Sequence, residues 1–496
     1  MLTFFIFTTF LLILATWILK HFYSRKKLYV IANKMHGPMA YPFIGNAGLF
    51  ICRDEEILSK IYNVIEKFES PMRFWVGPEL ALITTKLNHI QRILSSPKFY
   101  HKHDLYRFVK SYLGNGLVSG SGPTYKKHRR IIQPLFNLKY CTNQIEIMQK
   151  YTDVCMKNLE SYVDKGTFDI HLISHKCFVD IIGETILGTK MNIQKNGYTK
   201  FCKSAIDMYA NGFTRLTRPW LHPDFIYKFT NNYKREKEII KDIKDFLNTV
   251  IASSWQRRSL NNANISDVSP IIDQIGEYIN QNPNSISNTD FISHMITLFA
   301  AAEDTMTIIT SFVCLCLGMY PEYQNKAVEE VRQIFGTTPR TVTYEDIQKL
   351  EYLDMCIKDV ERLCPIAPYI LRQCLEDEEI NESLKIPKGA CVVVPIFNIH
   401  RNPELWKNPL HFYPDHFLPE AVSKRHVYGF VPFSAGPRGC IGKIFANVCL
   451  KTFLANFLQR FEVEADGKFP DVKLKMDIST RPIDGYKIRL KKRVWK

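Results

Sequence analysis

The chain has 496 residues, 46% of them hydrophobic, and a formal net charge of +16. The Lys and Arg residues are scattered, with no basic helix interleaved with stacking aromatics, which argues against the known nucleic-acid-binding modules. The 13 Cys have no regular spacing and no C-x-x-C pair, which excludes a disulfide scaffold and indicates a reducing compartment.

Residues 1–20 predict a membrane anchor. Leu2 to Leu19 contains no charged residue and is just long enough to span a bilayer core. Basic residues follow from Lys20 onward, which places the C-terminal side in the cytosol. There is no A-x-A-like cleavage site and no Arg-rich amphipathic pattern, so we expect a retained single-pass anchor of the endoplasmic reticulum.

Residues 21–46 predict a basic hinge between this anchor and one large domain over 47–496. Gly37-Pro38, Pro42 and Gly45 favour turns in this hinge. The motifs described below are spread along most of the chain, so they must meet at one site within one domain.

The domain is predicted to be mainly helical. Apolar residues recur at helical spacing over 123–163, 168–188, 231–255, 287–320, 321–335 and 351–364. Short strand-like runs occur at 72–76, 80–84 and 391–395. Residues 259–286 are rich in Asn, Ser and Ile without a clear period, and we expect a loop-rich connection there.

The segment 287–320 is the longest predicted helix. Ser287 and Asp290 form a capping-box-like start, and Pro321 follows its end. The helix is nearly all apolar, yet Glu303, Asp304 and Thr305 lie at its centre. Acids at mid-span argue against a membrane helix and for a buried helix beside a cofactor.

Near the C-terminus stands Phe433-Ser-Ala-Gly436-Pro-Arg438-Gly439-Cys440-Ile-Gly442. A thiolate in an apolar pocket can bind haem iron and favour O–O cleavage. Glycines let the backbone approach closely and direct N–H groups at the sulfur. A cation such as Arg438 can bind a haem propionate. The alternative is a buried structural cysteine beside a Gly-rich turn.

Together these landmarks resemble the cytochrome P-450 superfamily over almost the whole chain. The segments Asp180–Gly188 and Pro414–Glu420 are similar to the microsomal family-4 clan, particularly its insect branches. The resemblance implies a mainly α fold with small β-sheets and one catalytic domain behind the anchor. It also implies haem b, with Cys440 as the axial ligand of the iron.

The resemblance assigns roles to further residues. Asp304 and Thr305 match the acid-alcohol pair that manages proton delivery, although Ala302 replaces the usual glycine of A-G-x-D-T. Family-4 relatives often carry a haem-linked Glu where this chain has Ala301, so we expect non-covalent haem. The residues implied to contact the cofactor are Tyr125, Arg129, Arg372, Phe433, Arg438 and Gly442.

A buried ion network is also implied behind the cysteine loop. Asp359 stands where the E-x-x-R helix usually has Glu, and Arg362 keeps the arginine. His416 replaces the arginine of the P-E-R-F loop. Residues 359 and 362 share a helix face, so we expect a shifted but intact ion pair.

These features predict a monooxygenase that inserts one atom of O₂ into a lipophilic substrate. Electrons would come from NADPH through NADPH-cytochrome P-450 reductase, with cytochrome b5 as a further candidate donor. Residues 100–120 and 205–220 occupy the family's substrate-contacting regions. The net positive charge is either a solvated surface or a docking face for an acidic donor and anionic lipid. The alternatives are a non-catalytic haem protein that sequesters or senses a ligand, and an isomerase or dehydratase on the same scaffold.

Overall fold

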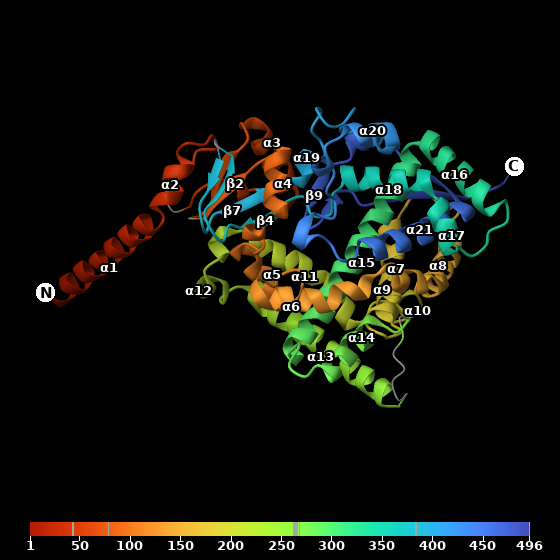
Figure 1. The fold of residues 1–496 in the computed structure, drawn as a ribbon, viewed down its shortest axis with the longest axis horizontal. Coiled ribbons are helices and arrows are strands. Elements are labelled where there is room, and N and C mark those ends of the chain that lie inside the picture. Colours follow the sequence, from red (N-terminus) through yellow and green to blue (C-terminus); the bar gives the residue numbers. More distant parts are fainter. Residues whose placement is uncertain (42–43, 78, 261–265, 267, 382–383, 496) are drawn as a thin grey trace.

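The computed structural model describes residues 1–496 except 42–43, 78, 261–265, 267, 382–383 and 496. Helices make up most of the body, and small sheets lie at its edges (Figure 1). This confirms the predicted mainly α class with small β-sheets.

The helices lie in the following ranges. The α-helices are α1 (Leu2–Ser24), α2 (Lys26–Ala32), α3 (Ile57–Lys67), α4 (Leu87–Ser95), α5 (Arg107–Leu113), α6 (Gly122–Ile132), α7 (Leu138–Asn143), α8 (Ile145–Glu160), α9 (Ile170–Thr185), α10 (Ile193–Asn196), α11 (Lys200–Thr217), α12 (Asp224–Tyr227), α13 (Asn231–Leu260), α14 (Ile271–Gln281), α15 (Asn288–Met319), α16 (Pro321–Phe335), α17 (Tyr344–Lys349), α18 (Glu351–Leu363), α19 (Ile396–Ile399), α20 (Pro419–Lys424) and α21 (Lys443–Arg460).

The strands form four sheets among the described residues. A four-stranded sheet has the order β1 (Met72–Val76), β2 (Glu79–Ile83), β7 (Cys391–Val394), β4 (Ile370–Gln373). A three-stranded sheet joins β3 (Phe168–Asp169), β11 (Lys487–Lys492) and β8 (Phe461–Glu464). The two remaining pairs are β5 (Glu378–Asn381) with β6 (Leu384–Ile386), and β9 (Leu474–Met476) with β10 (Thr480–Pro482).

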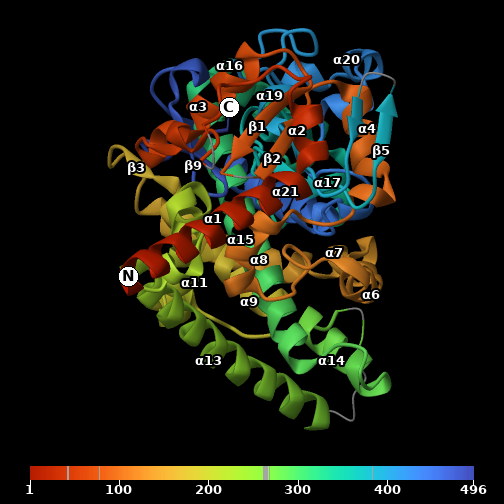
Figure 2. The ribbon, with the colours of Figure 1, turned by 90° about the vertical axis from the view of Figure 1, so that its left-hand side faces the viewer.

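Helix α15 forms the centre of the core. The Ser287 side chain caps its first turn by accepting the Asp290 N–H at 3.1 Å. The helix packs against α9, α18 and α21 and runs through the middle of the body in both views (Figures 1 and 2). Among the described residues it alone is long and apolar enough to span a membrane, but 83% of its apolar window is buried in the protein. It is therefore a core helix, as its central acids predict.

The four-stranded sheet carries Arg372 into the interior. Strand β7 is buried throughout, pairs in parallel with β2, and pairs antiparallel with β4. Arg372 lies opposite Val392 in this register and is buried. The runs predicted as strands at 72–76, 80–84 and 391–395 are present as β1, β2 and β7.

Two predicted segments differ from the structure. The single helical run over 123–163 is divided into α6, α7 and α8, because Pro134 lacks the N–H that a continuous helix needs. The prediction of a loop-rich connection over 259–286 is wrong in its second half, where α14 forms. Ile271, Ile272 and Ile275 share one face of α14 and are buried in the main core. The first half includes 261–265 and 267, which lie outside the described residues.

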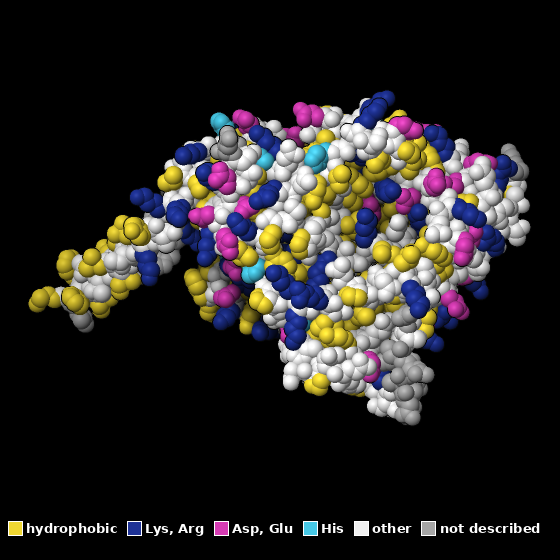
Figure 3. Space-filling view, in the orientation of Figure 1, with side chains coloured by type: hydrophobic (Ala, Val, Ile, Leu, Met, Phe, Trp, Pro, Cys, Tyr) yellow, Lys and Arg dark blue, Asp and Glu magenta, His cyan; other side chains and the backbone are white. Residues whose placement is uncertain are grey.

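The N-terminal helix α1 extends away from the body (Figures 1 and 3). Its exposed apolar side chains include Phe4, Phe7 and Leu12. The predicted hinge, residues 21–46, contains the end of α1 and then α2, which packs on the sheet through Tyr29, stacked on Trp75 with ring centroids 4.9 Å apart. Pro42 lies outside the described residues.

Candidate active site

The thiol of Cys440 is accessible to solvent although protein atoms surround it. Cys440 is exposed, whereas the other cysteines are buried or, for Cys52, partly buried. Burial nevertheless raises the pKa of the Cys440 thiol, and the N–H groups of Gly442 and Lys443 partly offset this by hydrogen bonding to the sulfur. Lys443 begins α21, so the positive end of that helix also favours a thiolate.

Local hydrogen bonds set the shape of the cysteine loop. The Cys440 N–H donates to the Phe433 carbonyl at 2.9 Å, and the Gly439 N–H donates to the Gly436 carbonyl at 2.9 Å. Gly436 has φ +66°, and a Cβ there would lie 2.0 Å from the Leu94 carbonyl oxygen. Only glycine fits this position without a shift of the backbone, which explains why the loop has Gly436 there.

A small cavity of about 40 Å³ lies between α15 and the cysteine loop. Its lining is mostly apolar and comprises Thr305, Met306, Ile309, Glu361, Ile366, Pro432, Phe433, Ala446 and Leu450. Burial, reinforced by Asp354, raises the pKa of Glu361 to about 8. The one acid in the lining is therefore uncharged at neutral pH.

Three cations meet beside the cysteine loop. Burial and the nearby Arg372 and Arg438 guanidinium groups hold the pKa of Lys102 well below its usual value. Burial also lowers the pKa of both arginines. Within the described part of the chain, none of the three forms an ion pair with a carboxylate. Two of these side chains, Arg372 and Arg438, are buried. Buried cations without a counter-charge are costly, so the cluster fits an anionic group such as the two propionates of a haem.

The remaining residues implied to bind cofactor surround this cluster. Arg438 donates to the Tyr100 carbonyl at 2.8 Å and stacks 3.5 Å above the Tyr125 ring centroid. Arg129 donates to the Tyr125 hydroxyl at 2.7 Å and to the Gly439 carbonyl at 2.8 Å. Arg129 thus binds the backbone of the cysteine loop. Arg372 and Arg438, in contrast, belong to the cation cluster that has no ion pair with a carboxylate among the described residues.

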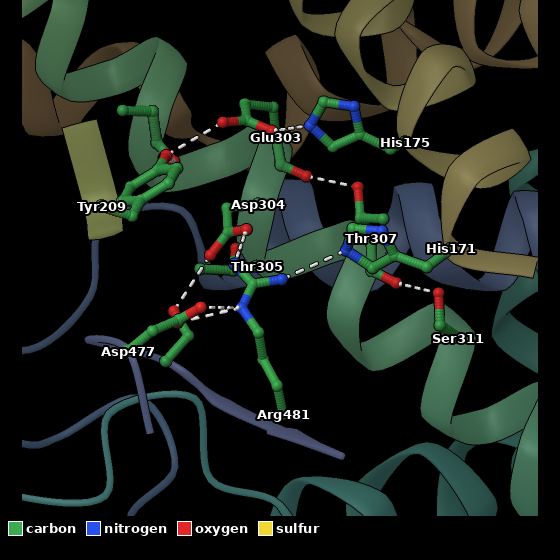
Figure 4. Close-up of polar contacts among 12 residues, drawn as sticks. His171, His175, Tyr209, Glu303, Asp304, Thr305, Thr307, Ser311, Asp477 and Arg481 are labelled. Atoms are coloured by element: carbon green, nitrogen blue, oxygen red, sulfur yellow. Dashed lines mark hydrogen bonds and ion pairs between the residues drawn. The ribbon is translucent and has the colours of Figure 1, made fainter. Parts of the chain in front are cut away.

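The side chains of Asp304 and Thr305 are not brought together. The Thr305 hydroxyl donates to the Ala301 carbonyl at 2.8 Å and lies at the cavity. The Asp304 carboxylate is buried and binds the Arg481 guanidinium at 2.5 Å and the Ser479 hydroxyl at 3.0 Å (Figure 4). The alcohol of the expected pair faces the cavity, while the acid is held by the β9–β10 hairpin.

The expected Asp359–Arg362 ion pair is present and buried. Arg362 binds the two carboxylate oxygens of Asp359 at 2.6 and 3.2 Å. His416 Nδ1 lies 2.8 Å from Asp359 Oδ1, and its Nε2 lies 2.5 Å from the Lys407 carbonyl oxygen. Both ring nitrogens face acceptors, and only the imidazolium form donates from both. The His416 ring therefore links the Asp359 carboxylate to the backbone of the segment before the cysteine loop.

Three residues of the site were missed by the sequence analysis: Lys102, Arg481 and Glu361. Lys102 and Arg481 are single basic residues with no local pattern, and their partners lie far away in the sequence. Glu361 lies next to Arg362 in the sequence but takes no part in the Asp359–Arg362 ion pair. Its place in the cavity lining depends on how α18 packs against α15.

Comparisons with known proteins agree with this geometry. Residues 35–490 match the family model described as cytochrome P-450. The chain is 30% identical to cytochrome P-450 4V2 of Rattus norvegicus, over 92% of this chain and 89% of that protein. It is 30% identical to cytochrome P-450 4c21 of Blattella germanica, over 91% and 92%. It is 28% identical to cytochrome P-450 4c3 of Drosophila melanogaster, over 94% and 90%.

Proposed function

The chain belongs to the cytochrome P-450 family of haem monooxygenases, and on that premise we propose that it oxidises a lipophilic substrate with electrons from NADPH. The electrons pass through a partner reductase, because the chain itself shows no flavin or dinucleotide motif. The helix α1 anchors the enzyme in the endoplasmic reticulum membrane, with the catalytic domain in the cytosol.

The observation that carries this proposal is the accessible thiol of Cys440, in a loop whose Pro432 and Phe433 line the mostly apolar cavity. Haem, when bound, supplies the activation and reductive cleavage of O₂. Cys440 would hold its iron, while Lys102, Arg372 and Arg438 would neutralise its propionates. The Gly442 and Lys443 amides stabilise the negative charge on the sulfur.

The cavity residues control what reaches the reacting atoms. The apolar side chains Met306, Ile309 and Ile366 exclude bulk water and favour a lipophilic substrate. Thr305 is the hydroxyl at the cavity surface and can accept and pass on a proton once it releases the Ala301 carbonyl.

Two measurements test the proposal. Reduced protein with carbon monoxide should absorb near 450 nm, and Cys440→Ser should abolish that band while the buried control Cys449→Ser retains it. Substrate-dependent NADPH consumption with a reductase distinguishes an enzyme from a haem protein that only sequesters a ligand. A 450 nm band in Cys440→Ser would refute the assignment of the axial ligand.

A further inference from the structure

A second polar cluster surrounds Glu303, on a different face of α15 from Thr305 (Figure 4). His175 Nε2 lies 2.6 Å from Glu303 Oε2, and His175 Nδ1 lies 2.8 Å from the Tyr198 hydroxyl. The Tyr209 hydroxyl donates to Glu303 Oε1 at 2.9 Å. His175 and Glu303 are buried, whereas Tyr198 is partly exposed. Hydrogen bonds therefore run from a partly exposed hydroxyl through the interior to α15.

The inner end of this chain lies beside the backbone that binds Thr305. The Ala300 carbonyl lies 2.8 Å from the same Tyr209 oxygen and is the alternative acceptor of its single O–H. The next carbonyl along the helix, that of Ala301, accepts the Thr305 hydroxyl. The side chain of Ala301 is exposed on a helix that runs through the centre of the body. A water molecule at Ala301 would join the chain to the cavity.

Asp304, in contrast, is held by a partner that does not exchange protons. Burial alone would lower the pKa of Arg481, but Asp304 and Asp477 more than offset it and raise that pKa above its usual range. A guanidinium is not deprotonated in proteins. His171 Nε2 lies 3.2 Å from the same guanidinium and accepts a hydrogen bond from it. Asp304 is therefore paired with a group that cannot supply it with a proton.

Every member of the Glu303 cluster can both accept and release a proton. Burial raises the pKa of Tyr198 and of Tyr209, and Glu303 adds to each increase. Both hydroxyls therefore stay protonated and pass one proton on only as they receive another. In the tautomer with its proton on Nε2, His175 donates to Glu303 and its Nδ1 accepts from the Tyr198 hydroxyl.

We propose that Tyr198, His175, Glu303 and Tyr209 carry protons from solvent to the cavity, and that Glu303 rather than Asp304 is the acid of this site. The inference deepens the proposed function and rests on it. The sequence carries one proton and no electrons. Tyr198 takes a proton from water and gives its own to His175 Nδ1, and the ring releases its Nε2 proton to Glu303. The Glu303 carboxyl group then rotates and gives a proton to the Tyr209 hydroxyl. Tyr209 releases its own hydroxyl proton to water in the cavity.

Conservative variants test this chain in the haem-loaded enzyme. We expect Glu303→Gln and Tyr209→Phe to lower the product formed per NADPH about tenfold and to raise the peroxide formed. A positioned proton donor contributes about 100-fold or more to the rate, but the Thr305 hydroxyl is still present and limits the loss. Glu303→Asp should restore part of the loss. Matched controls are Glu236→Gln and Tyr227→Phe, since the Tyr227 hydroxyl donates to buried Glu236 at 2.7 Å in a similar pair outside this cluster. Both controls should leave coupling unchanged.

A second comparison separates the two acids. The solvent isotope effect on product formation should change in Glu303→Gln and change less in Asp304→Asn. The reverse order, or full coupling in both Glu303→Gln and Tyr209→Phe, would overturn the proposal. These outcomes require an enzyme that shows the 450 nm band and turns over, so they are distinct from failure of the proposed function.

A spectroscopic measurement tests the chain without turnover. In resting protein labelled with ¹⁵N-histidine, the signal lost in His175→Gln identifies this ring. We expect a proton on Nε2, acceptance at Nδ1, and a shift of both signals in Glu303→Gln. A His175 ring protonated only on Nδ1, or unaffected by Glu303→Gln, would refute the hydrogen-bond directions on which the path depends.

Discussion

Replacing Arg362 by alanine is expected to abolish haem-loaded protein. Besides its two bonds to Asp359, the Arg362 guanidinium donates to the Pro409 carbonyl at 2.6 Å, the His411 carbonyl at 2.7 Å and the His400 carbonyl at 3.2 Å. Arg362 thus fixes the segment that precedes the cysteine loop. Its removal leaves a buried carboxylate without its cation and three carbonyl groups without this hydrogen-bond donor.

The magnitude follows from burial. Removing one partner of a buried ion pair costs about 3–5 kcal/mol, and each orphaned carbonyl adds to this. Folded domains are stable by only about 5–15 kcal/mol, so most of the margin is lost. The Tyr413 N–H, 2.6 Å from Asp359 Oδ2, and the His416 ring still contact the carboxylate and reduce this cost. They do not replace the two hydrogen bonds from the Arg362 guanidinium.

The matched control is Arg332→Ala. Arg332 pairs with Glu329 at the same i, i+3 spacing and with two bonds, of 2.9 and 3.1 Å, but both side chains are about half exposed. We expect little or no loss of stability there, because water screens an exposed ion pair. The assay is haem bound per polypeptide, together with the urea midpoint of whatever folded protein is recovered. If Arg362→Ala binds haem and unfolds like wild type, the network does not support the cysteine loop.

Three further predictions concern the cavity and its pH response. Thr305→Ala should raise peroxide per NADPH while the carbon monoxide spectrum stays normal, and unchanged coupling would contradict a role in proton delivery. Denaturing chromatography should release unmodified haem, because Ala301 has no carboxylate for a covalent link; haem that stays with the polypeptide would refute this. The unfolded chain loses the Glu361 proton near pH 4.5 whereas the folded protein keeps it to about pH 8, so stability falls as pH rises between these values. Glu361→Gln should remove this slope and stabilise the protein by about 2–4 kcal/mol at pH 8, measured by urea unfolding at pH 5 and pH 8.

The sequence by itself determined the features that depend on near neighbours in the chain. The capped start of α15, its end before Pro321, and the Asp359–Arg362 pair follow from helical geometry over three or four residues. The shape of the cysteine loop follows from glycine at a position that no other residue fits. For these reasons, the ligand cysteine and the helix that faces it could be predicted before the fold was known.

Only the tertiary structure decided which distant residues complete the site. Lys102 reaches Arg372 through the pairing of His101 with Gln373, and Arg481 reaches Asp304 because the β9–β10 hairpin packs on α15. Helical position places Glu303 and Thr305 on different faces, but the partners of each acid come from α9, α11 and β10. Such contacts depend on how whole elements pack, and a short local pattern does not encode them. The identity of the proton-carrying acid is therefore a property of the fold.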